Sequence, residues 1–323
     1  MKRVLAGVLI CCGATAQHGL AREAGGEGHA RMMAITIDDL PGTGDGAGDL
    51  DGLRSITDRV LGALEKGKAP ATGFVVESGL LVEGEVDARI AMLRRWVGAG
   101  LSLGNHTFSH RRLDESPLQE YMDDVVRGDT ITRMLMKEAG RPVRYFRHPF
   151  TSTGGSREIK DRLEEFLRAR GYRIAPFTIE AADYAFDAIY VDALGRGEAS
   201  LARRILEEYL DHTDTMCEFF ERRSREVLGR EVAQILLIHA NAINGAALGE
   251  MLERLGRRGY RFVTLERALE DEAYSIADDY VGPRGLSWIH RWTVSLGQEM
   301  RYELEPDPPE EILERYSEIV EGR

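Results

Sequence analysis

The residues best suited to chemistry lie in five short polar clusters. They are TIDD at 36–39, HTFSH at 106–110, RHPF at 147–150, AADY at 181–184 and LLIH at 236–239. Each cluster follows an apolar run that is typical of a β-strand. In a barrel of alternating strands and helices, the loops that leave the strands form one face, where residues distant in sequence meet. The clusters therefore predict a single site of acids, imidazoles and one arginine, as in a metal-dependent hydrolase.

The cluster at 106–110 supplies two imidazoles four residues apart. If residues 107–110 enter a helical turn, His106 and His110 face one centre. With one carboxylate they form a set that leaves coordination positions of a zinc or similar ion open for water and substrate. Successive side chains of a strand point to opposite faces, so we expect Asp38 and Asp39 to divide metal binding and proton transfer. An HxxxH pair alone is equally typical of a surface helix.

Three further residues are expected at the same face of the barrel. Arg147 precedes His148 and Pro149, and its cation is placed to orient a carboxylate, although an ordinary surface arginine is the alternative. Asp183 and His239 are expected to end two more strands. A carboxylate bonded to a ring nitrogen fixes the imidazole tautomer and raises its pKa, as a general acid requires. A histidine after an apolar run is otherwise typical of a protein core.

Apolar runs of strand length alternate with segments of helical periodicity. The expected strands are 32–37, 71–76, 101–104, 143–146, 172–178, 232–238 and 260–263. The expected helices are 53–66, 86–98, 117–139, 156–170, 199–229 and 246–257. This alternation predicts an α/β fold with a mostly parallel sheet, and seven or eight units favour a closed barrel. An open, doubly wound sheet is the alternative.

The charge balance bears on the partner. Lys and Arg total 42 against 54 Asp and Glu, a net charge of −12 in a chain of 323 residues. No basic excess offsets the charge of a phosphate-rich partner, so we expect no nucleic acid.

The first 16 residues are typical of a secretory signal. Lys2 and Arg3 precede an apolar run at 4–12, and small residues end at Ala16, where we expect cleavage. Residues 17–30 then form a flexible linker, and the mature chain is periplasmic or extracellular, without an integral membrane segment. The alternative is a short helix at the chain start. Only Cys217 of three cysteines would remain, so no internal disulfide is expected, and its helical context indicates a buried apolar role.

Residues 272–323 form a C-terminal extension beyond the barrel. Its closing stretch PPEEILERYSEIV is typical of a helix with proline at its start. Trp288, His290 and Trp292 alternate in a way that suits a sugar-binding surface, but packing on the barrel is the favoured interpretation.

In this order and spacing, the five clusters resemble the polysaccharide deacetylase family, which shares the NodB homology domain and is similar to carbohydrate esterase family 4. The resemblance covers residues 31–271 and implies a distorted (β/α)7–8 barrel. It implies that Asp38 is the general base, held by Arg147, and that His239 is the general acid, oriented by Asp183. It also implies three metal ligands and two residues of the oxyanion and substrate region: Asp39, His106, His110, Phe150 and Tyr184.

The implied activity is removal of acetyl groups from an N-acetylated polysaccharide or oligosaccharide, with release of acetate. One divalent ion is implied, Zn²⁺ first, with Co²⁺ or Ni²⁺ as alternatives. His148, Phe150 and Tyr184 stand where the family often has proline, tyrosine and tryptophan, and these differences alter the walls of the acetyl pocket and the cleft but not the residues of the reaction itself. The alternatives are an O-acetyl polysaccharide esterase of the same fold and a noncatalytic glycan-binding protein.

Overall fold

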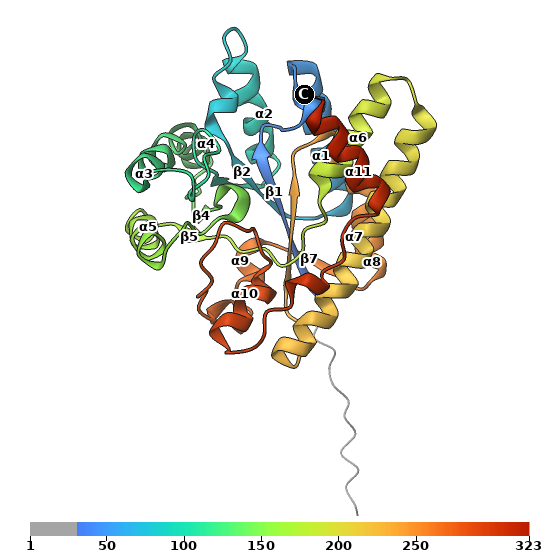
Figure 1. The fold of residues 1–323 in the computed structure, drawn as a ribbon. Helices are drawn as coiled ribbons and strands as arrows, with labels where there is room; N and C mark the ends of the chain where they lie inside the picture. Colours follow the sequence, from blue (N-terminus) through green and yellow to red (C-terminus); the bar gives the residue numbers. More distant parts are fainter. Residues whose placement is uncertain (1–30, 323) are drawn as a thin grey trace, which may run out of the picture.

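The computed structural model describes residues 31–322 and contains one curved sheet surrounded by helices (Figure 1). Within these residues all strand pairs are parallel, and the main path runs β5-β4-β3-β2-β1-β6, with β7 beside β1. The strands are β1 (Met32–Leu40), β2 (Ala71–Val75), β3 (Ser102–Asn105), β4 (Tyr145–Phe146), β5 (Arg173–Ile174), β6 (Gln234–His239) and β7 (Arg261–Val263).

A single stretch of backbone closes the gap between β5 and β6. The amide of Thr178 donates to the Ile235 carbonyl at 2.9 Å, and the amide of Leu237 donates to the Ile179 carbonyl at 2.9 Å. Ile179 and Leu236 form a parallel bridge outside the named strands. The sheet is therefore an α/β distorted barrel, as the sequence predicts, with its seam at residues 178–179.

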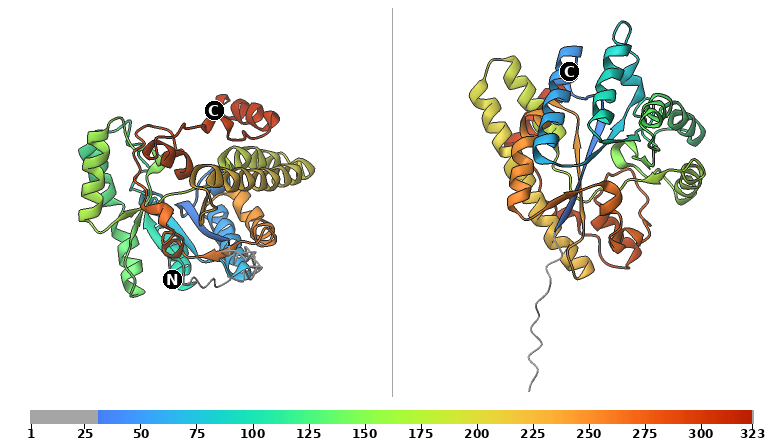
Figure 2. Two further views of the ribbon diagram at one scale, coloured as in Figure 1. Left: turned by 90° about the horizontal axis from the view of Figure 1, so that it is seen from below. Right: turned by 180° about the vertical axis from the view of Figure 1, so that it is seen from behind.

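Helices cover the outside of the sheet (Figure 2). Helix α1 packs against α8, and α6 packs against α7, α8 and α11. The helices are α1 (Leu50–Gly67), α2 (Val86–Gly98), α3 (Leu118–Arg127), α4 (Thr130–Glu138), α5 (Arg157–Ala169), α6 (Asp183–Gly195), α7 (Ala199–Leu228), α8 (Ala242–Arg257), α9 (Leu265–Ala268), α10 (Trp288–Ser295) and α11 (Glu310–Glu321). Five short 3₁₀ segments are η1 (Asp45–Ala47), η2 (Glu77–Leu80), η3 (Pro149–Thr151), η4 (Glu272–Ser275) and η5 (Tyr302–Leu304).

Strand β1 pairs with β2, β6 and β7, and its carboxyl end holds the first polar cluster. Its residues 33–38 are all buried, which suits the unbroken apolar run of a parallel strand covered on both faces. Neighbouring β6 keeps register with it as far as the pair Asp38–His239. The two strands therefore bring their terminal polar residues to the same edge.

The expected elements are found, but the helices differ in several respects, and α9 and α10 were not predicted. The predicted helix 117–139 is two helices, α3 and α4, which separate at Gly128 and Asp129. A Cβ at Gly128 would lie 2.3 Å from the Thr107 carbonyl carbon, so glycine lets the backbone approach the 106–110 loop. Helix α6 was not predicted. Its neighbours α7, α8 and α11 bury several of its sides, so it lacks a clear apolar stripe.

The C-terminal extension packs on the barrel. Trp288 and Trp292 are 8% and 0% exposed and lie one turn apart on α10. The favoured packing interpretation is thus confirmed, and these two rings do not line a sugar-binding surface. Cys217 is fully buried on α7, as expected.

The predicted signal at 1–16 and linker at 17–30 lie outside the described residues and stay predictions. Between residues 31 and 322, no helix combines the length and apolar character that crossing a membrane requires.

Candidate active site and metal centre

Asp39, His106 and His110 converge beyond the ends of β1 and β3. One ligand atom of each lies within 4.8 Å of the others. The His106 and His110 Nε2 atoms are 3.4 and 3.3 Å from Asp39 Oδ1. The ligand atoms of the three residues predicted to bind the metal are therefore close enough to bind one ion.

Left-handed backbone, and not a helical turn, brings the ligands together. Asp39, Thr107 and His110 have φ of 66°, 66° and 55°, a conformation that costs a non-glycine residue on the order of 1–3 kcal/mol. The expected helical turn after Thr107 is thus wrong. The positive φ of Asp39 also breaks strand alternation, so Asp38 Oδ2 and Asp39 Oδ1 both lie near His106 Nε2, at 3.8 and 3.4 Å. The expectation that the two aspartates face opposite sides is wrong for the same reason.

Two polar side chains hold the 106–110 loop in this shape. The amide of Thr107 donates to Asn105 Oδ1 at 2.7 Å. Asp124 Oδ2 accepts from the amides of Phe108 and Ser109 at 3.2 and 2.9 Å. These bonds offset part of the cost of the left-handed residues.

The three side chains fit a divalent ion. Asp39 Oδ1 is buried and, among the described residues, has no hydrogen-bond partner. His106 Nδ1 lies 2.8 Å from the Arg147 carbonyl, to which it donates as Nδ1–H, so His106 Nε2 presents a lone pair to the candidate ion site. Burial lowers the pKa of His110 to about 4, which leaves that ring neutral at pH 7. Burial raises the pKa of Asp39, but the two imidazoles, when protonated, and His239 outweigh burial and lower it.

Asp38 lies beside the metal ligands and is held by Arg147. Arg147 Nη1 is 3.4 Å from Asp38 Oδ2, and its Nη2 donates to Thr36 Oγ1 at 3.1 Å and to the Pro176 carbonyl at 3.2 Å. Arg147 is 1% exposed, so it is not a surface arginine. Asp38 Oδ1 is buried and has no hydrogen-bond partner within residues 31–322. One oxygen of Asp38 is thus anchored and the other is free.

Asp183 holds His239 by both ring and backbone. His239 Nδ1 lies 2.7 Å from Asp183 Oδ1, and the His239 amide donates to Asp183 Oδ2 at 2.7 Å. Asn244 Nδ2 also donates to Asp183 Oδ2 and, at 3.0 Å, to the His239 carbonyl. Burial lowers the pKa of His239, but the Asp183 carboxylate outweighs it and raises the pKa to about 10. Asp183 begins α6 and does not end a strand as expected.

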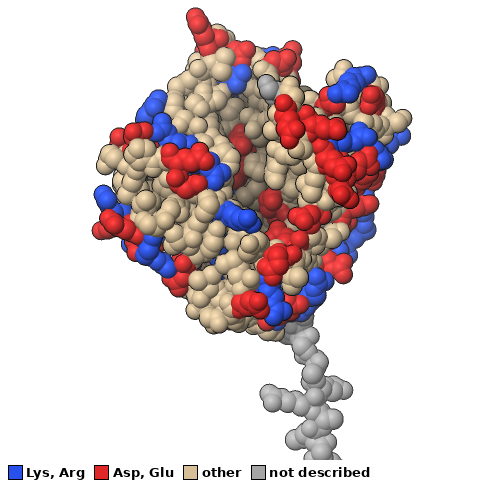
Figure 3. Space-filling view, viewed as in Figure 1, with Lys and Arg blue, Asp and Glu red and all other residues tan. Residues whose placement is uncertain are grey.

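Phe150 and Tyr184 are exposed side chains near this centre. Phe150 is 47% exposed, and its ring centroid lies 4.6 Å from that of His110. Phe150 and Thr151 have φ of 55° and 46°, so the 148–153 loop carries two left-handed residues in succession. Tyr184 is 53% exposed and meets Tyr316 of α11 edge to face, with centroids 5.6 Å apart. In the view of Figure 3 the surface of the molecule is hollowed, with acidic side chains inside the hollow and along one wall.

The nine residues predicted from the sequence thus lie around the carboxyl ends of the strands, and the structure adds supporting residues that the sequence reasoning missed. Thr36 lies inside the first cluster but was given no role. Asn244 follows His239 by five residues in HANAIN, and this short spacing of amides is the signal that could have found it. Asp124 lies on α3 and has no such signal in the sequence, because only folding brings it to the 106–110 loop.

Comparison with protein families gives one match. Residues 25–175 match the family described as "Polysaccharide deacetylase". This stretch includes the first three polar clusters and ends before the clusters at 181–184 and 236–239. No curated protein matches the chain.

Solved structures show the same fold. A CE4 family pseudoenzyme from Bacillus anthracis, in a mutant with restored enzymatic activity, is 18% identical, with 75% of this chain and 68% of that chain covered and a TM-score of 0.50. The peptidoglycan deacetylase PdaC from Bacillus subtilis is 20% identical, with 75% and 91% covered and a TM-score of 0.47. At these identities the likeness of the first structure supports the distorted barrel and no more.

Proposed function

We propose that this chain, whose residues 25–175 match the polysaccharide deacetylase family, is a metal-dependent hydrolase that removes acetyl groups from an N-acetylated polysaccharide or oligosaccharide and releases acetate. One observation carries the proposal. The same end of the barrel holds the three candidate metal ligands, the Asp38 carboxylate with one free oxygen, and the His239 imidazole bonded to Asp183.

Asp39, His106 and His110 would hold the ion. Two imidazole nitrogens and one carboxylate oxygen form the donor set of a catalytic zinc site, and Co²⁺ or Ni²⁺ accept the same donors. A divalent ion there supplies Lewis acidity to a carbonyl oxygen and lowers the pKa of a water ligand. Removing it should therefore remove activity.

Asp38 would act as the general base. Its Oδ1 has no partner among residues 31–322, so it is free to take the proton that water loses on attacking the acetyl carbon. Arg147 holds the other oxygen and keeps the carboxylate aimed. The buried contacts of Arg147 with Thr36 and Pro176 fix that direction.

His239 would act as the general acid. Its Nδ1–H is engaged by Asp183, so in the protonated ring Nε2 is left to donate its proton to the departing nitrogen. The raised pKa of about 10 keeps the ring protonated at neutral pH. An amine leaving group needs such a donor more than an alkoxide does, because an amide nitrogen leaves poorly unless it is protonated. Backbone N–H groups near Phe150 would donate hydrogen bonds to the acetyl oxygen and stabilise the negative charge that develops on it.

Two alternatives use the same barrel. An O-acetyl esterase would need the acid less, and a glycan-binding protein would need neither acid nor base. A similar protein of known structure is described as a pseudoenzyme, but this chain keeps both Asp38 and His239 with their partners. That pairing favours an amide-cleaving enzyme.

An acetate-release screen tests the proposal. Purified protein is incubated with chitin oligomers, peptidoglycan and acetylated xylan, with and without a chelator. Release from an N-acetylated substrate that stops with chelator supports the proposal. Release from acetylated xylan alone indicates the esterase, and glycan binding without any release indicates the binding protein.

We also propose, from residues 1–16, that the protein acts outside the cytoplasm.

A further inference from the structure

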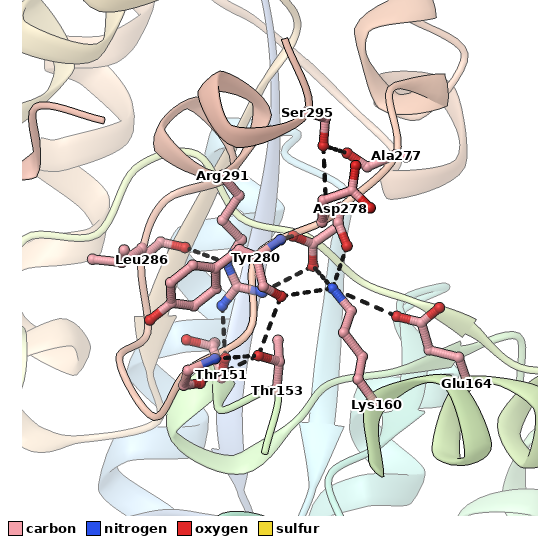
Figure 4. A network of polar contacts seen from close by, with 12 residues as sticks. Thr151, Thr153, Lys160, Glu164, Ala277, Asp278, Tyr280, Leu286, Arg291 and Ser295 are labelled. Carbon is pink, nitrogen blue, oxygen red and sulfur yellow. Dashed lines mark hydrogen bonds and ion pairs between the residues drawn. The ribbon is translucent and has the colours of Figure 1, made fainter. Parts of the chain in front are cut away.

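The 148–153 loop next to the metal centre is held by the C-terminal extension, far beyond the part of the chain that matches the family. Arg291 of α10 is 0% exposed, and its Nη2 donates to the Thr151 carbonyl at 2.6 Å. Its Nε donates to the Leu286 carbonyl at 2.9 Å, and its Nη1 bonds Asp278 Oδ2 at 3.2 Å (Figure 4). Each of the three guanidinium nitrogens therefore makes a hydrogen bond or ion pair, and Nη2 bonds the loop.

A second buried cation fixes the extension from the barrel side. Lys160 of α5 is 4% exposed, and its Nζ donates to the Tyr280 carbonyl at 2.9 Å and pairs with Asp278 Oδ2 at 2.9 Å. Asp278 therefore joins Lys160 to Arg291, as Figure 4 shows. Two cations on one carboxylate leave the Arg291 side chain little freedom.

Thr153, two residues after Thr151, pairs with the extension through its backbone amide and its side chain. The amide of Thr153 donates to the Gly282 carbonyl at 3.1 Å, and the amide of Gly282 donates to Thr153 Oγ1 at 3.0 Å. Gly285 lies equally close. A Cβ there would be 2.3 Å from Thr151 Oγ1 and 2.8 Å from the Phe150 carbonyl oxygen. The segment 278–291 thus contacts the loop on several sides.

These contacts fall on residues in an unfavourable conformation. Phe150 and Thr151 both have positive φ, and neither is glycine. Such a conformation persists where the surroundings over-determine it. The Phe150 ring reaches the His110 ring, so a relaxed loop would also change the wall of the metal centre.

We propose that Arg291 is a positioning residue for the reaction, which acts through the Thr151 carbonyl to keep the 148–153 loop in its active shape. The inference rests on the proposed function for its kinetic part. It makes the C-terminal extension a part of the catalytic unit, and it separates Arg291 from the residues that touch the substrate or the metal.

Two variants of the full-length protein test the positioning role from different sides. Arg291→Gln removes the fork that bonds Thr151. Gly285→Ala adds a methyl group against the loop without removing a buried charge, so it decides the question if Arg291→Gln does not fold. The matched controls are Arg301→Gln, an exposed arginine of the same extension that pairs with Glu299, and Gly249→Ala, where a Cβ meets open space.

Hydrogen exchange and kinetics are measured on the same preparations. We expect amides of 148–153 to exchange about tenfold faster in both test variants, with 106–110 and β6 unchanged. We expect kcat to fall about 10- to 100-fold, with KM and the Kd for zinc within about threefold of wild type. The controls should match wild type.

Unchanged exchange at 148–153 and unchanged kcat would overturn the inference. So would faster exchange across the whole barrel with proportional loss of zinc binding, because that pattern marks a merely structural residue. If the wild-type protein releases no acetate, the proposed function fails, while the exchange data still decide whether Arg291 holds the loop.

Discussion

The Asp183 carboxylate holds both ends of His239, accepting from its ring at 2.7 Å and from its backbone amide at 2.7 Å. The ring therefore cannot turn without breaking a buried, charge-assisted hydrogen bond. Asn244 bonds the same carboxylate and the His239 carbonyl, so the pair sits in a closed polar network. This network supports the proposed role of His239 as the general acid over that of a core histidine.

The pH profile should follow the Asp183–His239 pair. The folded pKa of His239 is raised to about 10, so the protonated, active form is present at neutral pH and is lost as pH rises toward that value. The charge of a bound cation would lower this pKa. Asp183→Asn removes the carboxylate that raises the pKa, so the alkaline limb of kcat should move at least about one unit lower. An alkaline limb at the wild-type pH would contradict the assignment of His239.

Asp38→Asn should separate catalysis from metal binding. The amide keeps the shape of the side chain but accepts no proton, so kcat should fall by about 10²- to 10⁴-fold. Zinc content should stay near one per chain, because the ligands are Asp39, His106 and His110. Measurement of kcat and of bound zinc on one preparation checks both. Loss of zinc together with activity would mean that Asp38 is a ligand.

His110→Ala should have the reverse result. One of three ligands is lost, so affinity for zinc should fall by at least about 100-fold and activity should fall with it. Equilibrium dialysis against buffered zinc measures the affinity directly. His212→Ala is a suitable control, because His212 is a buried histidine of α7 whose ring packs on Phe186 and which is not one of the three metal ligands. Equal zinc affinity in the His110 variant and the wild type would remove His110 from the site.

Stability should depend on pH through a different buried acid, Asp187 of α6. Burial raises its pKa to about 7, while its Oδ1 accepts from the Ile243 amide at 2.9 Å. The folded state thus binds this proton more tightly than the unfolded state does, and stability falls as pH rises from about 4 to 7.

Asp187→Asn keeps the acceptor and removes the titration. The effect of the substitution is the free energy of unfolding of the variant minus that of wild type. This difference should be more favourable to the variant at pH 8 than at pH 5 by roughly 2 kcal/mol or more. Chemical denaturation at the two pH values measures the difference. An identical effect of the substitution at both values would show that Asp187 does not titrate in this range.

Much of the fold could be predicted because apolar runs mark the strands. Residues 33–37 of the predicted run 32–37 are buried on both faces, and their strand has neighbours on both edges, where such runs belong. Helix α6 escaped prediction because it packs on several sides and shows no apolar stripe. Helices α3 and α4 were merged because the break at Gly128 serves a contact with Thr107, which only the folded chain reveals.

The sequence predicted which residues lie at the site but not its local backbone geometry. The polar clusters identified these residues because parallel strands bring their carboxyl ends to one edge. The left-handed backbone at Asp39 and Thr107 has no signal in the sequence, because neither residue is glycine. The same is true of Arg291, which is separated from Thr151 by 140 positions and reaches it through tertiary packing alone.

Acetate release under controlled metal loading tests the central claim most directly. Protein stripped with a chelator, the same protein reloaded with one equivalent of Zn²⁺, and a reloaded Asp39→Asn variant are compared on N-acetylated chitin oligomers. We predict no release from the stripped protein, recovery on reloading, and almost none from the variant. Equal release from all three samples would show that no ion at Asp39, His106 and His110 takes part in the reaction.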